Sequence, residues 1–290
     1  MRYIYEIKRC VCMHDLILNF TPTGMVPTKA MNPHVPISVN EIVEEVHQAY
    51  ESGITLAHLH ARDDQGEPTY HKAIYEKIVD GVRRHCNDLV ICLSLSGRNF
   101  NEFDKRSEPI ELMPDMGSLT LSSLNFSTQA SVNAPDMITR LAEKMNAYGV
   151  HPELEVFDLG MIQYGKYLMQ KGLIKPPYYF NLIFGNIAGM QADFNAMSAA
   201  LHELPHQSYW AFGGIGAQQL QANTAAIAMG GGVRVGLEDN LFMDKHKAVL
   251  ATNMALLQRI HHLGEMFERN IMSPSAFGAL GFYNSKRQRT

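Results

Sequence analysis

Short apolar runs alternate with amphipathic stretches along the chain, and glycine, proline and hydroxyl-bearing residues separate them. A short apolar run between turn residues indicates a buried strand, and an apolar residue at every third or fourth position indicates a helix with one buried face. The pattern predicts strands at residues 16–20, 54–60, 88–95, 118–122, 153–157, 178–184, 209–212 and 233–236.

A predicted helix follows each of these strands. The helices are expected at residues 38–52, 72–85, 101–112, 133–149, 160–171, 192–204, 217–229 and 245–268. The first helix begins with a capping box, because Glu41 follows Ser38 by three residues, and Gly53 ends it. Strict alternation of strands and helices predicts a parallel sheet with crossover helices. Eight such repeats in 290 residues predict an α/β fold, the (β/α)8 TIM barrel.

We expect residues 1–290 to form a single barrel domain. It would end in an extended helix at residues 245–268 and a tail that contains Gly, Ser and Arg. No Gly-x-Gly-x-x-Gly motif follows the first predicted strand, which argues against an open dinucleotide-binding sheet.

Composition narrows the possible partners. Hydrophobic residues make up 46% of the chain and charged residues 19%, so a large core is possible and disorder is not expected. The net charge is −4 and the basic residues are scattered, so no nucleic-acid partner is expected. No apolar run reaches about 18 residues, so no membrane span is expected.

The N-terminus and the cysteines indicate the compartment. Charged residues interrupt the N-terminus, which lacks the apolar region of a signal peptide; they are Arg2, Glu6, Lys8 and Arg9. The cysteines form no Cys-x-x-Cys pair, so neither a structural zinc site nor a disulfide framework is expected; they are Cys10, Cys12, Cys86 and Cys92. We therefore expect a reducing, cytoplasmic location.

The strand predicted at residues 54–60 ends in two histidines. Side chains at positions i and i+2 of a strand point to the same side, so His58 and His60 project together and could chelate a divalent metal. Arg62 continues this face if the strand persists, and Asp63 begins the turn, so all four polar residues could face one site. The alternative is an ordinary polar strand end.

Polar side chains also gather at the carboxyl ends of the other predicted strands. In a (β/α)8 barrel these ends meet at the face that carries active sites. A purely structural barrel would have little reason to place polar groups there. The residues are Asn19, Thr21, Thr23, Ser94, Ser96, Arg98, Thr120, Ser122, Asn125, Glu153, Glu155, Asp158, Asn181, Asn186, Arg234, Glu238, Asp239 and Asn240.

Glu238, one loop beyond the last predicted strand, is the candidate third metal ligand. With His58 and His60 it would give two imidazoles and one carboxylate, and a zinc site of this kind keeps a position open for substrate. Such a site polarises a carbonyl oxygen, although the same ligands accept several divalent ions. The alternative for Glu238 is a solvated carboxylate at a helix N-terminus.

Further charged residues are candidates for catalysis. Asp239 could act as a general base, and Arg234 could orient that base or bind a substrate carboxylate through paired hydrogen bonds. Glu153 and Glu155 share one face of their strand. A carboxylate inside a barrel is costly unless it is paired, so we expect at least Glu155 to hydrogen-bond into the site.

Three glycines follow the seventh predicted strand, Gly213, Gly214 and Gly216. Barrels often bind phosphate through backbone N–H groups in the loops after strands 7 and 8. A phosphate-binding loop and a tight turn are both compatible with this run.

Four segments together resemble the β-keto acid cleavage enzymes. They are Thr21-Pro-Thr-Gly-Met-Val-Pro-Thr-Lys29, His58-Leu-His-Ala-Arg-Asp63, Glu153-Leu-Glu-Val-Phe157 and Arg234-Val-Gly-Leu-Glu-Asp-Asn240. The resemblance implies a zinc-dependent (β/α)8 barrel, usually a homotetramer. It also implies a reaction in which a β-keto acid and acetyl-CoA give acetoacetate and a new CoA thioester.

The resemblance implies a role for each matching residue. His58, His60 and Glu238 match the zinc ligands, and Asp239 matches the base, which Arg234 holds. The substrate pocket is lined by polar residues that match Ser94, Thr120 and Glu155.

One segment departs from the family pattern. Many members carry Ser/Thr-Thr-Gly-Gly after the third strand, whereas this chain has Ser94-Leu-Ser-Gly-Arg98. Either Ser94 or Ser96 could therefore face the substrate. Arg98 would lie near the mouth of the barrel, where it could select an anionic substrate or contact CoA. CoA is too large to be buried whole and should lie across the mouth, with the turn at residues 213–216 a candidate for its phosphates.

Two other classes of protein fit part of the pattern. A different metal-dependent barrel lyase, aldolase or hydrolase is one, but amidohydrolase-like enzymes place His-x-His on the first strand and add further His and Asp ligands. The other is a non-catalytic barrel that binds a metal or ligand. It would be expected to lack part of the ligand set or the base, and this chain has all of them. The sequence therefore favours the enzyme and leaves its β-keto acid open.

Overall fold

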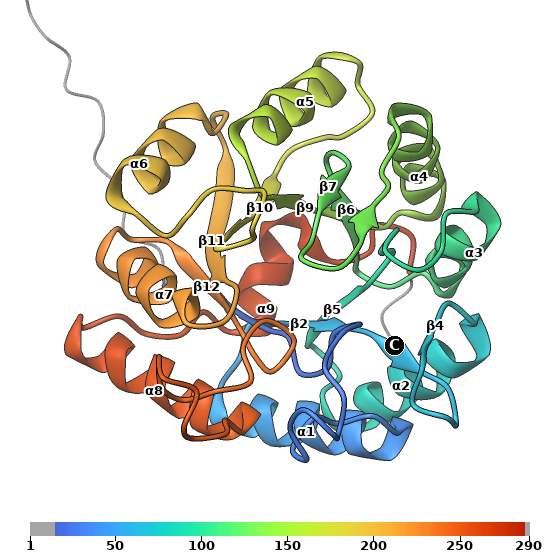
Figure 1. Cartoon of the computed structure of the whole chain (residues 1–290). Coiled ribbons are helices and arrows are strands. Elements are labelled where there is room, and N and C mark those ends of the chain that lie inside the picture. Colours follow the sequence, from blue (N-terminus) through green and yellow to red (C-terminus); the bar gives the residue numbers. More distant parts are fainter. Residues whose placement is uncertain (1–14, 288–290) are drawn as a thin grey trace, which may run out of the picture.

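The computed structural model describes residues 15–287, and its main strands close into a parallel barrel (Figure 1). The order around the barrel follows the chain, and the last strand pairs with the first. The strands are β1 (Leu18–Phe20), β2 (Leu56–Leu59), β5 (Val90–Leu93), β6 (Met116–Thr120), β9 (His151–Val156), β10 (Tyr178–Phe184), β11 (Ser208–Gly214) and β12 (Gly232–Val235). The predicted (β/α)8 barrel is confirmed.

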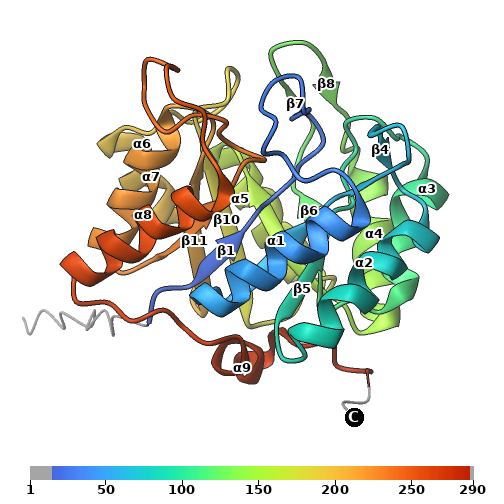
Figure 2. The same ribbon diagram turned by 90° about the horizontal axis from the view of Figure 1, so that it is seen from below.

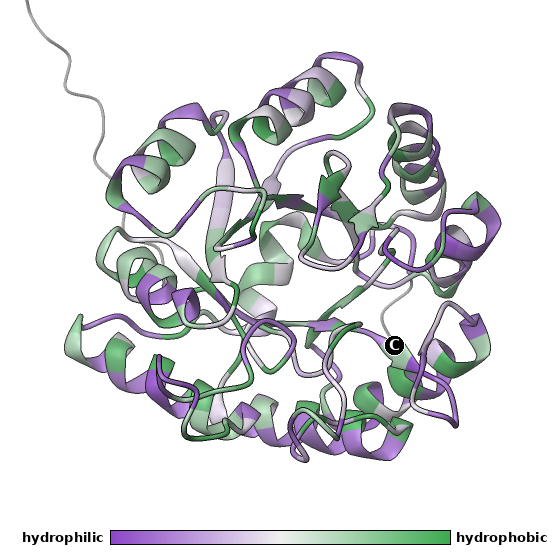
Figure 3. Ribbon diagram, viewed as in Figure 1, coloured by the Kyte–Doolittle hydropathy of each residue, from purple (hydrophilic) through white to green (hydrophobic). Residues whose placement is uncertain are grey.

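The helices form a ring outside the strands. They are α1 (Val39–Ser52), α2 (Lys72–His85), α3 (Phe103–Ser107), α4 (Pro135–Tyr148), α5 (Leu159–Gln170), α6 (Phe194–Glu203), α7 (Gln218–Ala228) and α8 (Asn253–Met266). The predicted capping box is present, because the Ser38 side chain accepts from the Glu41 N–H and the Glu41 carboxylate accepts from the Ser38 N–H. Figure 3 shows mixed hydropathy along the outer helices, as expected for elements with one buried face.

Two short hairpins stand above the carboxyl ends of the strands. They are β3 (Ala61–Arg62) with β4 (Pro68–Thr69), and β7 (Leu124–Asn125) with β8 (Ala130–Ser131). The sequence pattern did not predict either one. In Figure 2 the β7–β8 hairpin lies at the opposite end of the barrel from the C-terminal segment.

The last predicted helix, at residues 245–268, begins too early. The structure starts α8 at Asn253, and the side chain of Thr252 caps it by accepting from the Ala255 N–H. Before that point the Asp244 carboxylate accepts several backbone N–H groups, including that of Val249 at 2.7 Å. This side-chain bonding competes with helix formation and makes a loop of residues 244–250.

The C-terminal tail closes the end of the barrel opposite the hairpins (Figures 1 and 2). It contains α9 (Pro274–Phe277) followed by a π-type turn (Gly278–Phe282). Phe277 and Phe282 are fully buried, stack with 4.2 Å between ring centroids, and pack edge-on against Tyr179 of β10. The sequence analysis described this tail only by its composition. In the structure, its aromatic side chains are part of the core.

Some expectations lie outside the described residues. Those about Arg2, Glu6, Lys8 and Arg9 and about Cys10 and Cys12 fall on residues 1–14. Within residues 15–287, Cys86 and Cys92 are free and buried, and no helix combines the length and apolar character that crossing a membrane requires.

His151 at the start of β9 makes stability depend on pH. Its Nε2 donates to the Pro177 carbonyl at 2.6 Å and its ring packs edge-on against Phe282. Burial lowers its pKa to about 4. In the unfolded chain His151 takes up a proton near pH 6.5, whereas in the folded chain it does so only near pH 4. The free energy of unfolding therefore falls as the pH drops from 7 toward 4.

We expect the stability that His151 contributes to fall by about 2 kcal/mol between pH 7 and pH 5. The measurement is the urea unfolding free energy of the native chain and of His151→Gln at each pH. The difference between the two proteins should shrink at pH 5, and parallel pH profiles would contradict the prediction.

Candidate active site

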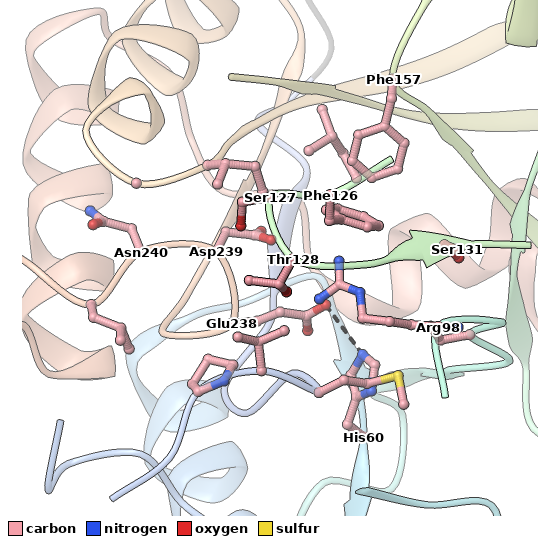
Figure 4. Close-up of a pocket in the computed structure, with 18 of the residues that line it drawn as sticks. His60, Arg98, Phe126, Ser127, Thr128, Ser131, Phe157, Glu238, Asp239 and Asn240 are labelled. Atoms are coloured by element: carbon pink, nitrogen blue, oxygen red, sulfur yellow. Dashed lines mark hydrogen bonds and ion pairs between the residues drawn. The ribbon is translucent and has the colours of Figure 1, made fainter. Parts of the chain in front are cut away.

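The carboxyl ends of the barrel strands surround a cavity of about 360 Å³ (Figure 4). It lies at the face where (β/α)8 barrels carry active sites. Most of the predicted site residues line it, namely His60, Ser94, Ser96, Arg98, Thr120, Glu155, Gly216, Arg234, Glu238 and Asp239. The structure therefore brings together residues that are spread over most of the sequence.

The three predicted metal ligands meet at one side of the cavity. His60 Nε2 lies 3.2 Å from His58 Nε2 and 3.2 Å from Glu238 Oε1, and the distance from His58 Nε2 to Glu238 Oε1 is 3.9 Å. His58 is buried behind His60 and, with it, comes from the end of β2. Glu238 follows β12, which is joined to β2 through β1.

This donor set fits a divalent metal ion. Bonds of about 2.1 Å in a tetrahedral site place neighbouring ligand atoms about 3.4 Å apart, and the three spacings seen here, 3.2, 3.2 and 3.9 Å, lie around that value. Glu238 Oε2 is buried and has no hydrogen-bond partner among the described residues. Gly24, with φ +68°, lets the loop after β1 approach the site, because a Cβ there would lie 2.6 Å from Glu238 Cγ.

Behind the ligands, Glu153 fixes the orientation of His58. Its Oε2 lies 2.5 Å from His58 Nδ1, and it also accepts hydrogen bonds from Asn19 and from the Cys92 thiol. Burial disfavours the charged forms of both residues, but the attraction between the two opposite charges is stronger. The pKa of His58 therefore rises to about 9, and that of Glu153 falls to about 2. Because the ionised Glu153 carboxylate can only accept hydrogen bonds, Nδ1 carries a hydrogen, and Nε2, which is directed toward His60, is the nitrogen left to bind a metal.

We expect Glu153→Gln to weaken metal binding by about 10- to 100-fold, because an amide accepts the Nδ1 hydrogen of His58 less strongly than a carboxylate, so the ring is less firmly oriented and Nε2 is a weaker ligand. Competition with a chelator of known affinity measures this. Glu111→Gln, which alters an exposed carboxylate paired with Lys72 and Lys144, is the matched control. Equal metal affinity in the two variants would remove Glu153 from this role.

Arg234 links the metal side of the cavity to the candidate base. Its guanidinium is buried and contacts Asp239 Oδ2 at 2.8 Å, Glu238 Oε1 at 2.6 Å and Glu155 Oε1 at 3.3 Å. Thr120 Oγ1 holds the other Glu155 oxygen at 2.7 Å. The predicted hydrogen bonding of Glu155 into the site is present.

The charges around Arg234 set the proton affinity of its neighbours. Burial raises the pKa of the Asp239 carboxyl, and the Arg234 cation works against that rise. Burial alone would lower the pKa of Arg234, but the carboxylates beside it hold that pKa well above its usual range. Asp239 is therefore a more basic carboxylate than one in water, which suits proton abstraction.

The expectation that Arg62 and Asp63 would face the site is wrong. Strand β2 ends at Leu59, so the two-residue alternation does not continue, and Arg62 belongs to β3. Its guanidinium instead binds the carbonyls of Gly24, at 2.7 Å, and Pro27, at 2.9 Å, and so holds the loop after β1. The Asp63 carboxylate accepts two N–H groups of its own turn.

The glycines after the seventh strand are packed closely. A Cβ on Gly213 would lie 3.2 Å from Arg234, and one on Gly214 would lie 2.6 Å from the Gln218 backbone. The Gly216 N–H donates to the Asp239 carbonyl, and Gly216 alone of the three lines the cavity. Packing thus requires glycine at 214, whereas a side chain at 213 would crowd Arg234, and the role of this turn in binding CoA stays a prediction.

Ser94, Ser96 and Arg98 all reach the cavity. Ser94 Oγ accepts from the Ser96 N–H, and Ser96 Oγ accepts from the Arg98 N–H. Both hydroxyl groups therefore remain candidates for substrate contact.

Aromatic residues that the sequence did not indicate complete the lining. Phe126, at the tip of the β7–β8 hairpin, and Phe157, after β9, meet edge-on with 5.7 Å between centroids. Strands of two residues leave no periodic signal, so the hairpin could not be predicted from the pattern.

Comparison with known proteins assigns the family. The model for the beta-keto acid cleavage enzyme family matches residues 15–280. The chain belongs to the β-keto acid cleavage enzyme family. Its predicted resemblance is confirmed, and so is its assignment as an enzyme.

Alignments with known relatives cover nearly the whole chain. The 3-keto-5-aminohexanoate cleavage enzyme of Fusobacterium nucleatum subsp. nucleatum is 36% identical over 264 residues, which cover 90% of this chain and 96% of that one. The 3-oxoadipate:acetyl-CoA acetyltransferase of Cupriavidus necator is 34% identical over 267 residues, or 91% and 93% of the two chains. A binary complex of ObcA with oxaloacetate has the same fold, with a TM-score of 0.71 at 18% identity over 86% of this chain and 67% of that one.

Proposed function

We propose that the protein is a divalent-metal-dependent enzyme that converts a β-keto acid and acetyl-CoA into acetoacetate and a new acyl-CoA. The observation that carries this proposal is the buried guanidinium of Arg234, which binds both the candidate metal ligand Glu238 and the candidate base Asp239 at one cavity wall. The names of the relatives support the same reaction class.

His58, His60 and Glu238 would hold the metal, for which zinc is our first choice among several divalent ions that accept these ligands. When bound, the ion supplies positive charge beside the keto and carboxylate oxygens of the substrate. We assign Ser94 and Ser96, whose side chains line the same cavity, as hydroxyl donors to the substrate.

Asp239 begins the reaction by taking a proton from C2 of the β-keto acid, and Arg234 keeps its carboxylate in place. The C2 carbanion attacks the thioester carbonyl of acetyl-CoA, a C–C bond forms, and CoA leaves as the thiolate. The thiolate then attacks the original ketone carbon. The bond between C2 and that carbon breaks, the acyl group leaves on CoA, and Asp239 returns its proton to C2 of acetoacetate.

Acetyl-CoA is larger than the cavity, so we propose that its nucleotide end lies across the barrel mouth. The turn that contains Gly213, Gly214 and Gly216 is the proposed contact for its phosphates, and Gly216 is the member that reaches the cavity. We also propose a cytoplasmic homotetramer, which light scattering of the purified protein tests.

A coupled assay tests the proposed function. Purified protein with measured metal content is given acetyl-CoA and a panel of β-keto acids, and both acetoacetate and the new thioester are measured. Equal amounts of the two products establish the reaction. Stoichiometric metal without either product, across the whole panel, would reject it.

A further inference from the structure

Arg98 is a cationic side chain that lines the cavity and forms no ion pair with another described residue. Across residues 15–287, its guanidinium makes no ion pair and no side-chain hydrogen bond, although it lines the cavity beside three carboxylates. The guanidinium groups of two other arginines, Arg234 and Arg106, already donate hydrogen bonds within the protein. Arg234 binds the carboxylates, and Arg106 binds the carbonyls of Leu95 and Val132.

The position of Arg98 is nevertheless fixed. Its guanidinium carbon lies 3.5 Å from the centroid of the Phe126 ring, which in turn packs against Phe157 (Figure 4). The loop that carries it is joined to the β7–β8 hairpin, because Gln129 Nε2 donates to Asn99 Oδ1 at 3.1 Å. A guanidinium stacked by its face keeps its N–H donors free along its edge.

The surroundings of Arg98 favour an anionic ligand. It is half-buried, and desolvation lowers its pKa, while the carboxylates of Glu238, Glu155 and Asp239 favour its charged form. Those carboxylates are already bonded to Arg234. A partly desolvated guanidinium with free donors gains most from a carboxylate that arrives with the ligand.

The ligand group that meets Arg98 belongs to the small substrate. Arg98 lies inside the cavity beside apolar side chains such as Leu124 and Phe157, whereas the nucleotide end of CoA is placed across the mouth. The reacting carboxylate is assigned to the metal that His58, His60 and Glu238 would hold, so it leaves the donors of Arg98 free for a second anionic group. We infer that Arg98 binds a second carboxylate at the far end of the substrate, so that β-keto dicarboxylates are the preferred class; this inference rests on the proposed function.

The test compares two substrates that differ only in that carboxylate, 3-oxohexanedioate and 3-oxohexanoate. We expect kcat/KM of the native enzyme to favour the dicarboxylate by roughly 10- to 100-fold. Arg98→Gln should bring the ratio close to one, mainly through KM for the dicarboxylate, and Arg98→Lys should keep part of the preference. Arg140→Gln is the matched control, because Arg140 stacks on Phe103 at 3.9 Å away from the cavity and should leave the ratio unchanged.

Calorimetric titration of the metal-loaded protein separates this inference from the reaction itself. Without acetyl-CoA, the dicarboxylate should bind roughly 10- to 100-fold more weakly to Arg98→Gln than to the native protein, and CoA alone should bind both equally. A native enzyme that does not distinguish the two acids, or a preference that survives in Arg98→Gln, would overturn the inference. Weaker CoA binding in that variant would assign Arg98 to CoA instead. If no β-keto acid is turned over, the proposed reaction fails, and the binding ratio still decides the role of Arg98.

Discussion

Replacing Glu238 with glutamine is expected to remove bound metal and turnover together. Glutamine has the same shape, but it offers a neutral oxygen to the metal and ends the ion pair with Arg234 at 2.6 Å. We expect metal affinity and kcat/KM each to fall by more than about 100-fold, because one of three protein ligands is lost. Elemental analysis after dialysis and the coupled assay measure the two quantities.

The control for Glu238→Gln must change a carboxylate without touching the cavity. Glu203→Gln does so, since Glu203 lies on α6 and pairs with Lys166 near the surface. It should keep full metal content and activity. A Glu238→Gln protein that is both metal-loaded and active would show that His58 and His60 hold the ion without this carboxylate.

Replacing Asp239 with asparagine is expected to spare the metal and stop the chemistry. Asparagine can still accept a hydrogen bond from Arg234 Nε, where Asp239 Oδ2 now lies at 2.8 Å, but it cannot take a proton. General-base catalysis supplies on the order of 10²- to 10⁴-fold, and we expect kcat to fall by that factor with little change in metal content.

Proton exchange isolates the step assigned to Asp239. With metal-loaded protein in D₂O and no acetyl-CoA, the native enzyme should speed exchange at C2 of the β-keto acid, and Asp239→Asn should not. Asp193→Asn is the matched control, because Asp193 caps α6 and asparagine also caps helices well. Native-like exchange in Asp239→Asn would assign the base to another group.

The sequence predicted the parts of the site that follow from regular geometry. His58 and His60 could be paired because strand side chains alternate, and Glu238 joined them because barrel closure brings the last strand beside the first. The same alternation misplaced Arg62, since the pattern does not show that β2 ends at Leu59.

Contacts between distant positions were not predictable in this way. Cys92 bonds to Glu153, which lies 61 residues later, and nothing in the sequence around either residue indicates the other. Phe126 reaches the cavity on a hairpin too short to leave a pattern. The start of α8 could not be predicted because the Asp244 carboxylate accepts hydrogen bonds from backbone N–H groups that would otherwise bond within a helix.

The tail beneath the barrel also constrains the order in which the chain can fold during synthesis. Strand β1 needs both β12 and the bridge from Leu16 to Ile271, and buried Asp115 accepts from the Asn284 N–H. Contacts this distant in sequence are made late in folding. The segment from β12 to Asn284 must therefore have left the ribosome before these contacts can form, and until then β1 has no partner strand on one edge.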